Sequence, residues 1–226
     1  NSLKIFRRNI QMIFQDPYES LNPRWTIKDI IKEPLDIHNI GNLTEREDTI
    51  VEILRTVGLT PPENYLSRYP HEISGGQRQR VSIARTLVMK PKFVICDEPT
   101  SMLDVSIRIS IMDLMLNLAK ELDVSYLYIT HDLAVARYMC NRIAVMFNGK
   151  IVEIAETEEL LNNPVHPYTK RLISSIPVPD PSYDRKVYDI NFDELDSLIE
   201  KYGSDKPMID IGNEHYIATH DVKGII

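Results

Sequence analysis

Short apolar runs alternate along the chain with longer stretches in which apolar residues recur every three or four positions. The runs predict strands at 9–14, 93–97, 126–129 and 143–147, and the helical spacing predicts helices at 77–89 and 105–122. Apolar strands that alternate with amphipathic helices are typical of an α/β domain with a mostly parallel sheet. Asn148-Gly149 predicts a type I′ hairpin, whose second strand at 151–154 would complete that sheet. Three methionines, Met102, Met112 and Met115, are expected to fill the core.

The segment between the first two strands carries helix signals. Thr26 is a suitable N-cap for one helix, and Pro34 is expected to limit that helix from its far side. The stretch Thr44-Glu-Arg-Glu47 has the composition of a capping box for a second helix, which Gly58 is suited to end. Residues 24–73 are therefore expected to form a small helical subdomain beside the sheet.

After the hairpin the pattern changes. Short helices are predicted from Thr157 and over 167–175. The proline-rich stretch 177–181 indicates a linker or an extended arm, and 192–202 has the pattern of an acidic amphipathic helix. The final residues carry no strong pattern.

Composition limits the class of protein. Of 226 residues, 43% are hydrophobic and 26% are charged, as in ordinary soluble globular proteins. The net charge is -7, with the excess of acid in residues 181–226, so the chain lacks the basic surface that nucleic-acid binding needs. No apolar run is long enough to cross a bilayer. Cys96 and Cys140 have no metal-binding spacing and are expected to be small buried residues.

Three predicted strands end in residues that can take part in chemistry, namely Gln15, the pair Asp97-Glu98, and His131. Parallel α/β sheets bind ligands at the carboxyl ends of their strands. Adjacent carboxylates there suit Mg²⁺-dependent phosphoryl chemistry, in which Asp97 holds the metal through a water and Glu98 accepts a proton from an attacking water. An acidic pair that merely caps the next turn is the alternative. The glutamine and histidine at the other strand ends disfavour it.

A second candidate site precedes the helix at 77–89. Gly75 and Gly76 would let backbone N–H groups approach a ligand, and Ser74 adds a hydroxyl. The helix that follows Gln77 points the positive end of its dipole at the same place. An ordinary N-capped turn is the alternative for an isolated Ser-Gly-Gly.

Five motifs together resemble those of the ATP-binding subunits of ABC transporters. They are Ile73-Ser-Gly-Gly-Gln-Arg-Gln-Arg80 as signature motif, Phe93-Val-Ile-Cys-Asp-Glu98 as Walker B, Ser101-Met-Leu-Asp104 as D-loop, Gln15-Asp16-Pro17 as Q-loop and Thr130-His131-Asp132 as switch histidine. They stand in the family's order and at its spacing. The stretches 9–24 and 163–169 further resemble the oligopeptide/dipeptide importers, in which Tyr18 and Arg24 suggest the second of two paired ATPases.

The resemblance implies an α/β, ABC-type nucleotide-binding domain with an inserted helical subdomain. The ATPase core would comprise 1–23, with the Q-loop strand, and 91–155, with Walker B, D-loop and switch histidine. The helical subdomain with the signature motif would cover 24–90. Residues 156–226 would form a C-terminal extension typical of peptide importers, with an acidic tail.

The resemblance also implies ATP and Mg²⁺ as cofactors, and ATP hydrolysis in a head-to-tail pair of ATPases that drives import of oligopeptides or dipeptides. Two transmembrane permease subunits would be contacted near the Q-loop, and an external solute-binding protein would act indirectly. No nucleic acid is implied. The subunit would lie at the cytoplasmic face of the cell membrane. Relatives in this branch also carry nickel or oligosaccharides, which leaves the solute open.

Each ATP site would be shared between two chains. One chain would supply Gln15 to position metal and water, Asp97 to support the metal, Glu98 as general base and His131 to sense the γ-phosphate. The partner chain would supply the signature residues Ser74, Gly75, Gly76 and Gln77 and the D-loop residue Asp104.

One motif of the family is missing. The phosphate-binding loop needs Gly-x-x-x-x-Gly-Lys-Ser/Thr, whereas the only Gly-Lys pair, Gly149-Lys150, lies in the hairpin and precedes isoleucine. In the family this loop lies upstream of the Gln15 strand, and the chain begins with Asn1 rather than methionine, so truncation at the N-terminus is expected. The 226-residue chain is therefore expected to bind Mg-ATP weakly and not to turn it over. Ile73 and Met102, where leucine and alanine are commonest, are mild departures.

Two rival functions remain. A related ATPase that acts on DNA or ribosomes is disfavoured, because the chain has no coiled-coil insertion and no second cassette. A non-catalytic partner that lends its signature face to another ATPase is disfavoured by intact Asp97, Glu98 and His131, although the missing phosphate loop keeps it open.

Overall fold

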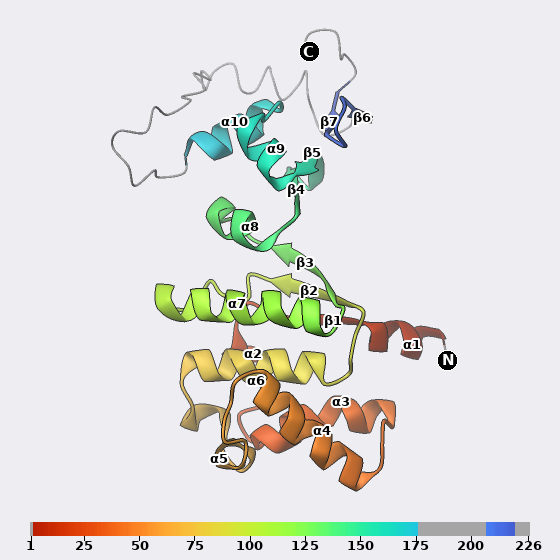
Figure 1. The fold of residues 1–226 in the computed structure, drawn as a ribbon, viewed down its shortest axis with the longest axis vertical. Helices are drawn as coiled ribbons and strands as arrows, with labels where there is room; N and C mark the ends of the chain where they lie inside the picture. The colour runs from red at the N-terminus through yellow and green to blue at the C-terminus, as the bar shows by residue number, and fades with distance from the viewer. Residues whose placement is uncertain (1, 176–206, 220–226) are drawn as a thin grey trace. The chain divides into compact units, whose positions relative to one another are not determined.

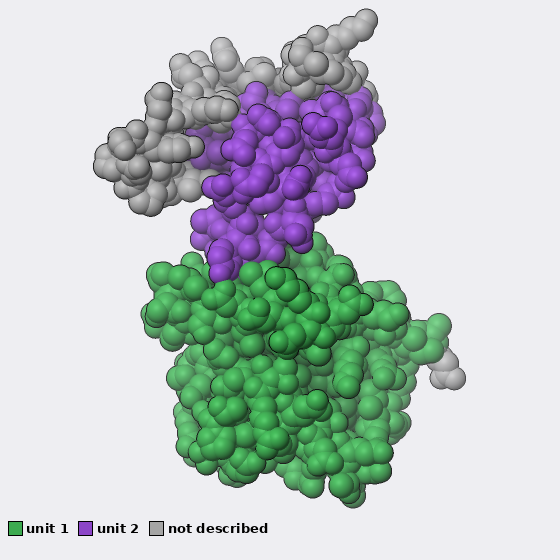
Figure 2. Space-filling view, viewed as in Figure 1, with its two compact units in different colours: residues 1–129 green, residues 130–226 purple. Residues whose placement is uncertain are grey.

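The computed structural model describes residues 2–175 and 207–219. The chain divides into two compact units, unit 1 at Asn1–Ile129 and unit 2 at Thr130–Ile226 (Figure 2). The predicted division into an ATPase core and a helical subdomain stays a prediction. No helix in the described part of the chain is long and apolar enough to cross a membrane.

Within the described residues the predicted helices and strands are present, with bounds close to those expected (Figure 1). Unit 1 contains α1 (Ser2–Asn9), β1 (Ile10–Ile13), α2 (Pro17–Ser20), α3 (Ile27–His38), α4 (Leu43–Thr56), α5 (Glu63–Leu66), a short 3₁₀ helix (Pro70–Glu72), α6 (Gly75–Leu87), β2 (Phe93–Asp97), α7 (Val105–Glu121) and β3 (Ser125–Ile129). In unit 2 the described elements are α8 (Leu133–Met139), β4 (Arg142–Phe147), β5 (Lys150–Glu156), α9 (Thr157–Asn162), α10 (Pro167–Ser174), β6 (Met208–Asp210) and β7 (Tyr216–Ala218).

Unit 1 is built on a parallel sheet of three strands in the order β1-β2-β3. Ile13 lies opposite Cys96, and Asp97 lies opposite Ile129, so the carboxyl ends of the three strands reach the same edge. The inner face of β2 carries Val94 and Cys96, both fully buried, as expected for Cys96. The predicted fold class, an α/β domain with a parallel sheet and helices, is therefore confirmed.

The predicted hairpin forms, but it does not complete the parallel sheet. Asn148 and Gly149 have φ of 47° and 78°, as a type I′ turn requires. Strands β4 and β5 belong instead to an antiparallel sheet of unit 2, in the order β4-β5-β7-β6. Strands β6 and β7 lie where the sequence shows no strong pattern, because three-residue strands are too short to reveal an alternation.

Helix α3 runs past the proline that was expected to limit it. Pro34 lies inside the helix, which continues to His38. Burial of Ile31 and Leu35 on either side of Pro34 outweighs the backbone hydrogen bond that the proline removes. The helix ends at Asn39, whose φ of 53° gives a left-handed C-cap.

Helix α4 begins earlier than predicted. Its N-cap is Asn42, whose Oδ1 accepts from the Glu45 N–H at 3.0 Å, while Glu45 Oε2 accepts from the Asn42 N–H at 2.8 Å. The predicted capping box from Thr44 is therefore wrong by two residues. Glu47, its expected second member, forms an ion pair with Lys28 at 2.6 Å instead. Asparagine caps helices as well as threonine does, so composition alone does not select between the two starts.

Helix α6 lies between α7 on one side and α3 to α5 on the other (Figure 1), and nine of its thirteen residues are buried. It also contacts β1 and α2. On the neighbouring helix α7, Met112 and Met115 are buried as predicted. The expectation for Met102 is wrong: it is 65% exposed, because it lies in the loop before α7 rather than on the helix's inner face.

In unit 2, the fully buried Glu153 of β5 joins several elements. Its Oε1 accepts from the Val165 N–H at 2.8 Å, and its Oε2 accepts from the His166 N–H at 3.1 Å. Buried His215 places Nε2 2.7 Å from Glu153 Oε1 and Nδ1 3.6 Å from Glu159 Oε1. Since a buried carboxylate is stable only when it is paired, this network fixes the start of α10 and the β6–β7 hairpin against β5.

The helices predicted after the hairpin are confirmed as α9 and α10, with one difference at a helix start. Glu156 is the N-cap of α9 and makes no side-chain cap bond, whereas the Thr157 hydroxyl donates to the carbonyl of half-buried Cys140 at 2.6 Å. The predicted linker at 177–181 and the predicted acidic helix at 192–202 fall outside the described residues.

Candidate functional site

The ends of β1 and β2 bring Gln15 and Glu98 together. Gln15 Nε2 donates to Glu98 Oε2 at 2.9 Å and lies 3.5 Å from Ser101 Oγ. Glu98 has a φ of 42°, in the left-handed region, which costs a non-glycine residue about 1–3 kcal/mol. Its N–H donates to the Ile129 carbonyl at 3.0 Å, which anchors the turn to β3. The structure thus holds a carboxylate in a strained turn at the edge of the sheet, beside an amide.

Asp97 is the last residue of β2 and is half-buried. Among the described residues, no cluster of three or more His, Cys, Asp and Glu side chains could hold a metal ion. Mg²⁺ does not require such a cluster, because one or two protein oxygens usually hold it while waters and phosphate oxygens complete its octahedron. The Gln15 amide oxygen and the Asp97 carboxylate are donors of this kind, so the residues fit Mg²⁺.

Ser74 and Gln77 form a reciprocal cap at the start of α6. Ser74 Oγ accepts from the Gln77 N–H at 3.3 Å, and Gln77 Oε1 accepts from the Ser74 N–H at 3.0 Å. Gln77 Nε2 also donates to the Tyr65 hydroxyl at 3.4 Å. Both side chains therefore order the turn itself, which is the alternative that the sequence left open. Their contact with a nucleotide stays a prediction.

The two glycines of this turn meet different surroundings. A Cβ on Gly76 would lie 2.7 Å from Ile107 Cγ2, closer than real Cβ contacts, whereas a Cβ on Gly75 would lie 3.9 Å from Leu103 Cδ2. Gly76 is therefore required by the close approach of α6 to α7. The expected reason, access of a ligand to the backbone, remains open for Gly75.

Asp104 stands at the start of α7, beside the start of α6. It is the N-cap residue, it is exposed, and its carbonyl accepts from the Arg108 N–H at 2.8 Å. Because Leu103 lies next to Gly75, the turn before α6 and the loop before α7 form one continuous edge of unit 1. Met102, in that loop, is exposed.

His131 belongs to unit 2 and lies in the turn that leads into α8. The turn is ordered by its neighbours: Thr130 Oγ1 accepts from the Asp132 N–H at 3.0 Å, and Asp132 Oδ1 accepts from the Ala134 N–H at 2.9 Å. The His131 side chain is exposed. Asp132 is therefore the helix cap that presents His131 at the surface of its unit.

Ser101 belongs to the site, although it is not among the predicted site residues. Its N–H and its hydroxyl both donate to the Glu98 carbonyl, at 3.1 Å and 3.0 Å. A serine three residues after Glu98 is a signal of such a turn, because its hydroxyl can reach back to the backbone. Ser101 thereby closes the strained turn that carries Glu98.

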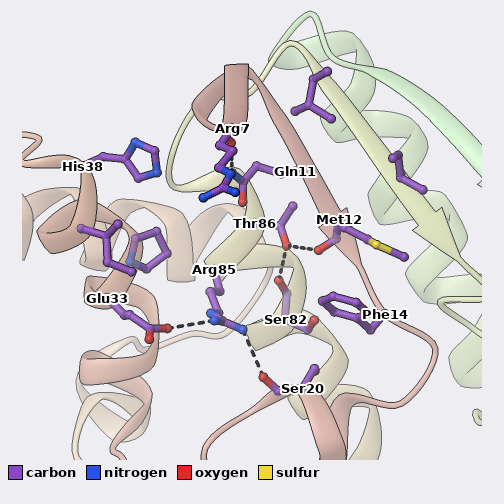
Figure 3. A pocket seen from close by; sticks show the side chains of 14 residues that line it. Arg7, Gln11, Met12, Phe14, Ser20, Glu33, His38, Ser82, Arg85 and Thr86 are labelled. Atoms are coloured by element: carbon purple, nitrogen blue, oxygen red, sulfur yellow. Dashed lines mark hydrogen bonds and ion pairs between the residues drawn. The ribbon is translucent and has the colours of Figure 1, made fainter. Parts of the chain in front are cut away.

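A pocket of about 410 Å³ lies beside β1, between α3 and α6 (Figure 3). Its apolar lining includes Phe14 and Ile37, which are 49% and 59% exposed. Across it, Arg85 Nη2 donates to Glu33 Oε2 at 2.8 Å, and Arg85 Nη1 donates to the Ser20 carbonyl at 3.1 Å (Figure 3). The pocket thus has an apolar lining and an internal ion pair.

His38 also lines this pocket. Burial, and after it the positive charges of Lys4 and Arg8, lower the pKa of His38. A lowered pKa favours the neutral form of the imidazole. A neutral imidazole and a satisfied ion pair suit the side chains of a protein partner better than they suit a phosphate chain.

Two family models match the chain. The model described as ABC transporter matches residues 1–101, and the model described as oligopeptide/dipeptide transporter, C-terminal region, matches residues 152–198. The first match contains Gln15, the turn before α6 and Glu98, and the second begins in β5.

Curated relatives resemble most of the chain. The oligopeptide transport ATP-binding protein OppF of Bacillus subtilis is 55% identical over 181 residues, which are 80% of this chain and 59% of that protein. The oligopeptide transport ATP-binding protein AmiF of Streptococcus pneumoniae is 51% identical over 216 residues, 93% of this chain and 67% of that protein. The chain thus spans 59% and 67% of the length of these two relatives.

A solved structure resembles the chain as well. It is the dimeric, post-hydrolysis state of an ATP-binding cassette bound to ADP and phosphate. The TM-score is 0.59 and the sequence identity is 32%, over 69% of this chain and 66% of that one.

Gly76→Ala should destabilise the chain by about 1–3 kcal/mol, because the new methyl group would overlap Ile107 Cγ2 and force α6 and α7 apart. Denaturant unfolding of the purified chain would measure the change. Gly75→Ala is the matched control, with ordinary contact distances, and should change stability by less than about 1 kcal/mol. In an Ile107→Ala background, which lacks the obstructing methyl group, Gly76→Ala should lower the free energy of unfolding by less than it does in the unchanged chain. Equal costs at the two glycines would contradict the packing explanation.

Proposed function

The chain belongs to the ABC transporter ATP-binding proteins of the oligopeptide/dipeptide branch, and on that premise we propose that it is the ATP-hydrolysing subunit of a peptide importer. The observation that carries the proposal is the Gln15–Glu98 pair, held at the ends of two parallel strands. The match of residues 152–198 to the C-terminal region of oligopeptide/dipeptide transporters supports peptides as the solute. The named relatives are oligopeptide transport proteins, which supports the same class.

In the proposed site, the two strand ends would hold Mg-ATP, whose γ-phosphate is the group that water attacks when ATP is hydrolysed. Glu98 accepts the proton of that water, as a general base at the strand end. The Gln15 amide nitrogen already donates to Glu98, which leaves its oxygen for the metal and its water. Asp97 would support the metal through a water, and His131 would sense the γ-phosphate.

The edge formed by the starts of α6 and α7 is proposed to serve the nucleotide of a second ATPase. Ser74, Gly75, Gly76 and Gln77 would offer N–H groups and a hydroxyl to its phosphates, and Asp104 would line the same interface. Helix N-termini favour anions, which supports phosphate there. The solved ATP-binding cassette is a dimer with ADP and phosphate, which supports a paired arrangement.

Further partners follow from the proposed transport. Two permease subunits would dock near Gln15 in the pocket lined by Phe14 and Ile37, and the solute-binding protein would act through them without touching this chain. The apolar lining and neutral His38 support a protein partner there. The subunit would lie on the cytoplasmic face of the membrane, without nucleic acid.

Glu98→Gln in the assembled transporter should lower ATP hydrolysis by about 10²–10⁴-fold while ATP binding persists. The amide keeps the size of the carboxylate and can still accept from Gln15, but it cannot take a proton from water. Phosphate release and nucleotide binding would be measured on the same preparation. Glu121→Gln, at the exposed end of α7, is the control and should hydrolyse ATP normally. Normal turnover by the Glu98 variant would remove Glu98 as the base.

The 226-residue chain by itself should bind Mg-ATP with a Kd weaker than about 1 mM and should not turn it over. The reason is the missing Gly-x-x-x-x-Gly-Lys-Ser/Thr segment, whose backbone N–H groups normally hold the phosphates. Titration calorimetry would test this, with the OppF relative as positive control. Binding in the micromolar range would contradict the proposal.

A cysteine at Ile37 should cross-link to a cytoplasmic loop of a permease subunit in the assembled transporter. Leu43→Cys is the matched control, because Leu43 is an exposed apolar residue, 71% exposed, that does not line the pocket. Both would be placed in a Cys140→Ser background, which removes the half-buried thiol. If the cysteine at Leu43 cross-links and the cysteine at Ile37 does not, the permease contact lies outside this pocket.

A further inference from the structure

Arg78 joins the helix that follows Ser74 to the loop that follows Gln15. Its N–H donates to the Ser74 carbonyl at 2.9 Å, so its backbone belongs to the first turn of α6. Its guanidinium carbon lies 3.6 Å from the centre of the Tyr18 ring, and its Nη2 donates to the Tyr18 hydroxyl. Nη1 donates to the Pro70 carbonyl at 3.1 Å. Arg78 thus connects the helix that begins after Ser74 with the segment that follows Gln15.

Arg78 is buried, whereas the Tyr18 ring that it contacts is 60% exposed. Arg78 is only 8% exposed, and its Nε has no hydrogen-bond partner in the described part of the chain. No salt bridge among the described residues involves Arg78. A buried guanidinium without a carboxylate depends on the partners it does have, and the face of an aromatic ring is a strong one when water is excluded. Tyr18 is therefore the main partner that keeps Arg78 in place.

The loop on the other side is short and stiff. Only Asp16 and Pro17 separate Gln15 from Tyr18, and Asp16 Oδ1 accepts from the Tyr18 N–H at 2.7 Å as the cap of α2. Pro17 fixes its own φ. At the far end of α2, Arg85 donates to the Ser20 carbonyl. Helix α2 is thus held to α6 at both ends.

We propose that Arg78 is a positioning residue that couples the Gln15 loop of one ATP site to the Ser74 turn offered to the partner's site. When Gln15 changes its ligand, Tyr18 moves with it and the first turn of α6 turns with Arg78. The proposal rests on the proposed function and adds to it the route by which two ATP sites sense one another. It also assigns the Tyr18 ring a role beyond packing.

The test uses the assembled transporter and the ratio of solute-stimulated to basal ATP hydrolysis. Arg78→Ala and Tyr18→Leu should each lower that ratio at least threefold, and the double variant should lower it no further than either single one, because both remove the same contact. Tyr18→Phe keeps the ring face and should retain most of the ratio. A residue with a merely structural role would lower basal and stimulated hydrolysis together.

Arg80→Ala is the matched control, because Arg80 lies on the same helix but donates to the Val57 carbonyl and to Ser110, away from α2. It should leave the ratio within twofold of the unchanged protein. An unchanged ratio in the Arg78 variant, or an equal fall in the Arg80 variant, would overturn the proposal. If the Arg78 variant fails to fold, the variants of Tyr18, which is 60% exposed, decide the question. Failure of the proposed function itself would appear separately, as normal hydrolysis by Glu98→Gln.

Discussion

The burial of α6 is the constraint on which unit 1 depends. Nine of its thirteen residues are buried, so its long basic side chains reach partners inside the protein. Arg78, Arg80 and Arg85 do so with the loop after β1, the end of α4, and α3. Gly76 lets α7 approach from the opposite side. Because each neighbour is attached to a different part of the helix, the position of α6 determines where the loop after β1 and the start of α7 can lie.

In unit 1, the ends of strands and the starts of helices offer different chemical groups to a ligand. Strand ends supply side chains, because Gln15 and Glu98 leave the sheet where β1 and β2 stop. Helix starts supply backbone N–H groups, because the first N–H groups of a helix have no carbonyl partner within it. At α6 the Ser74 hydroxyl already accepts from one of them, that of Gln77. Carboxylates repel phosphate oxygens unless a cation lies between them, whereas helix starts attract them directly. The strand ends therefore suit a metal-bearing part of a nucleotide site, and the start of α6 suits a metal-free one.

Features that depend on a few adjacent residues could be predicted from the sequence. The parallel strands, the cap formed by Ser74 and the hairpin at Asn148-Gly149 belong to this class. Features that depend on tertiary packing could not be predicted in this way. Helix α3 continues past Pro34 because the residues around the proline are buried, and Met102 is exposed although methionine favours the core. The same holds for Arg78, since a basic residue near a helix start gives no sign that a tyrosine sixty positions earlier will cover it. Local sequence signals determine the helices and strands, whereas the contacts of long side chains depend on the tertiary fold.

The segment from Gln15 to Ser20 is proposed to have two functions. It contacts the nucleotide site through Gln15, and it transmits movement of Gln15 to α6. Gln15 donates to a glutamate held in a strained turn, so a ligand that draws the Gln15 side chain away would also break its hydrogen bond to Glu98. The three residues that follow are constrained by a proline, an aspartate cap and a stacked ring, so they cannot absorb the movement by bending. The proposed displacement would then appear at α6, whose first turn is the surface proposed to face a partner's phosphates. In this proposal, the site with Gln15 affects the site with the Ser74 turn because the six-residue segment between Gln15 and Ser20 is stiff. No long-range pathway is needed.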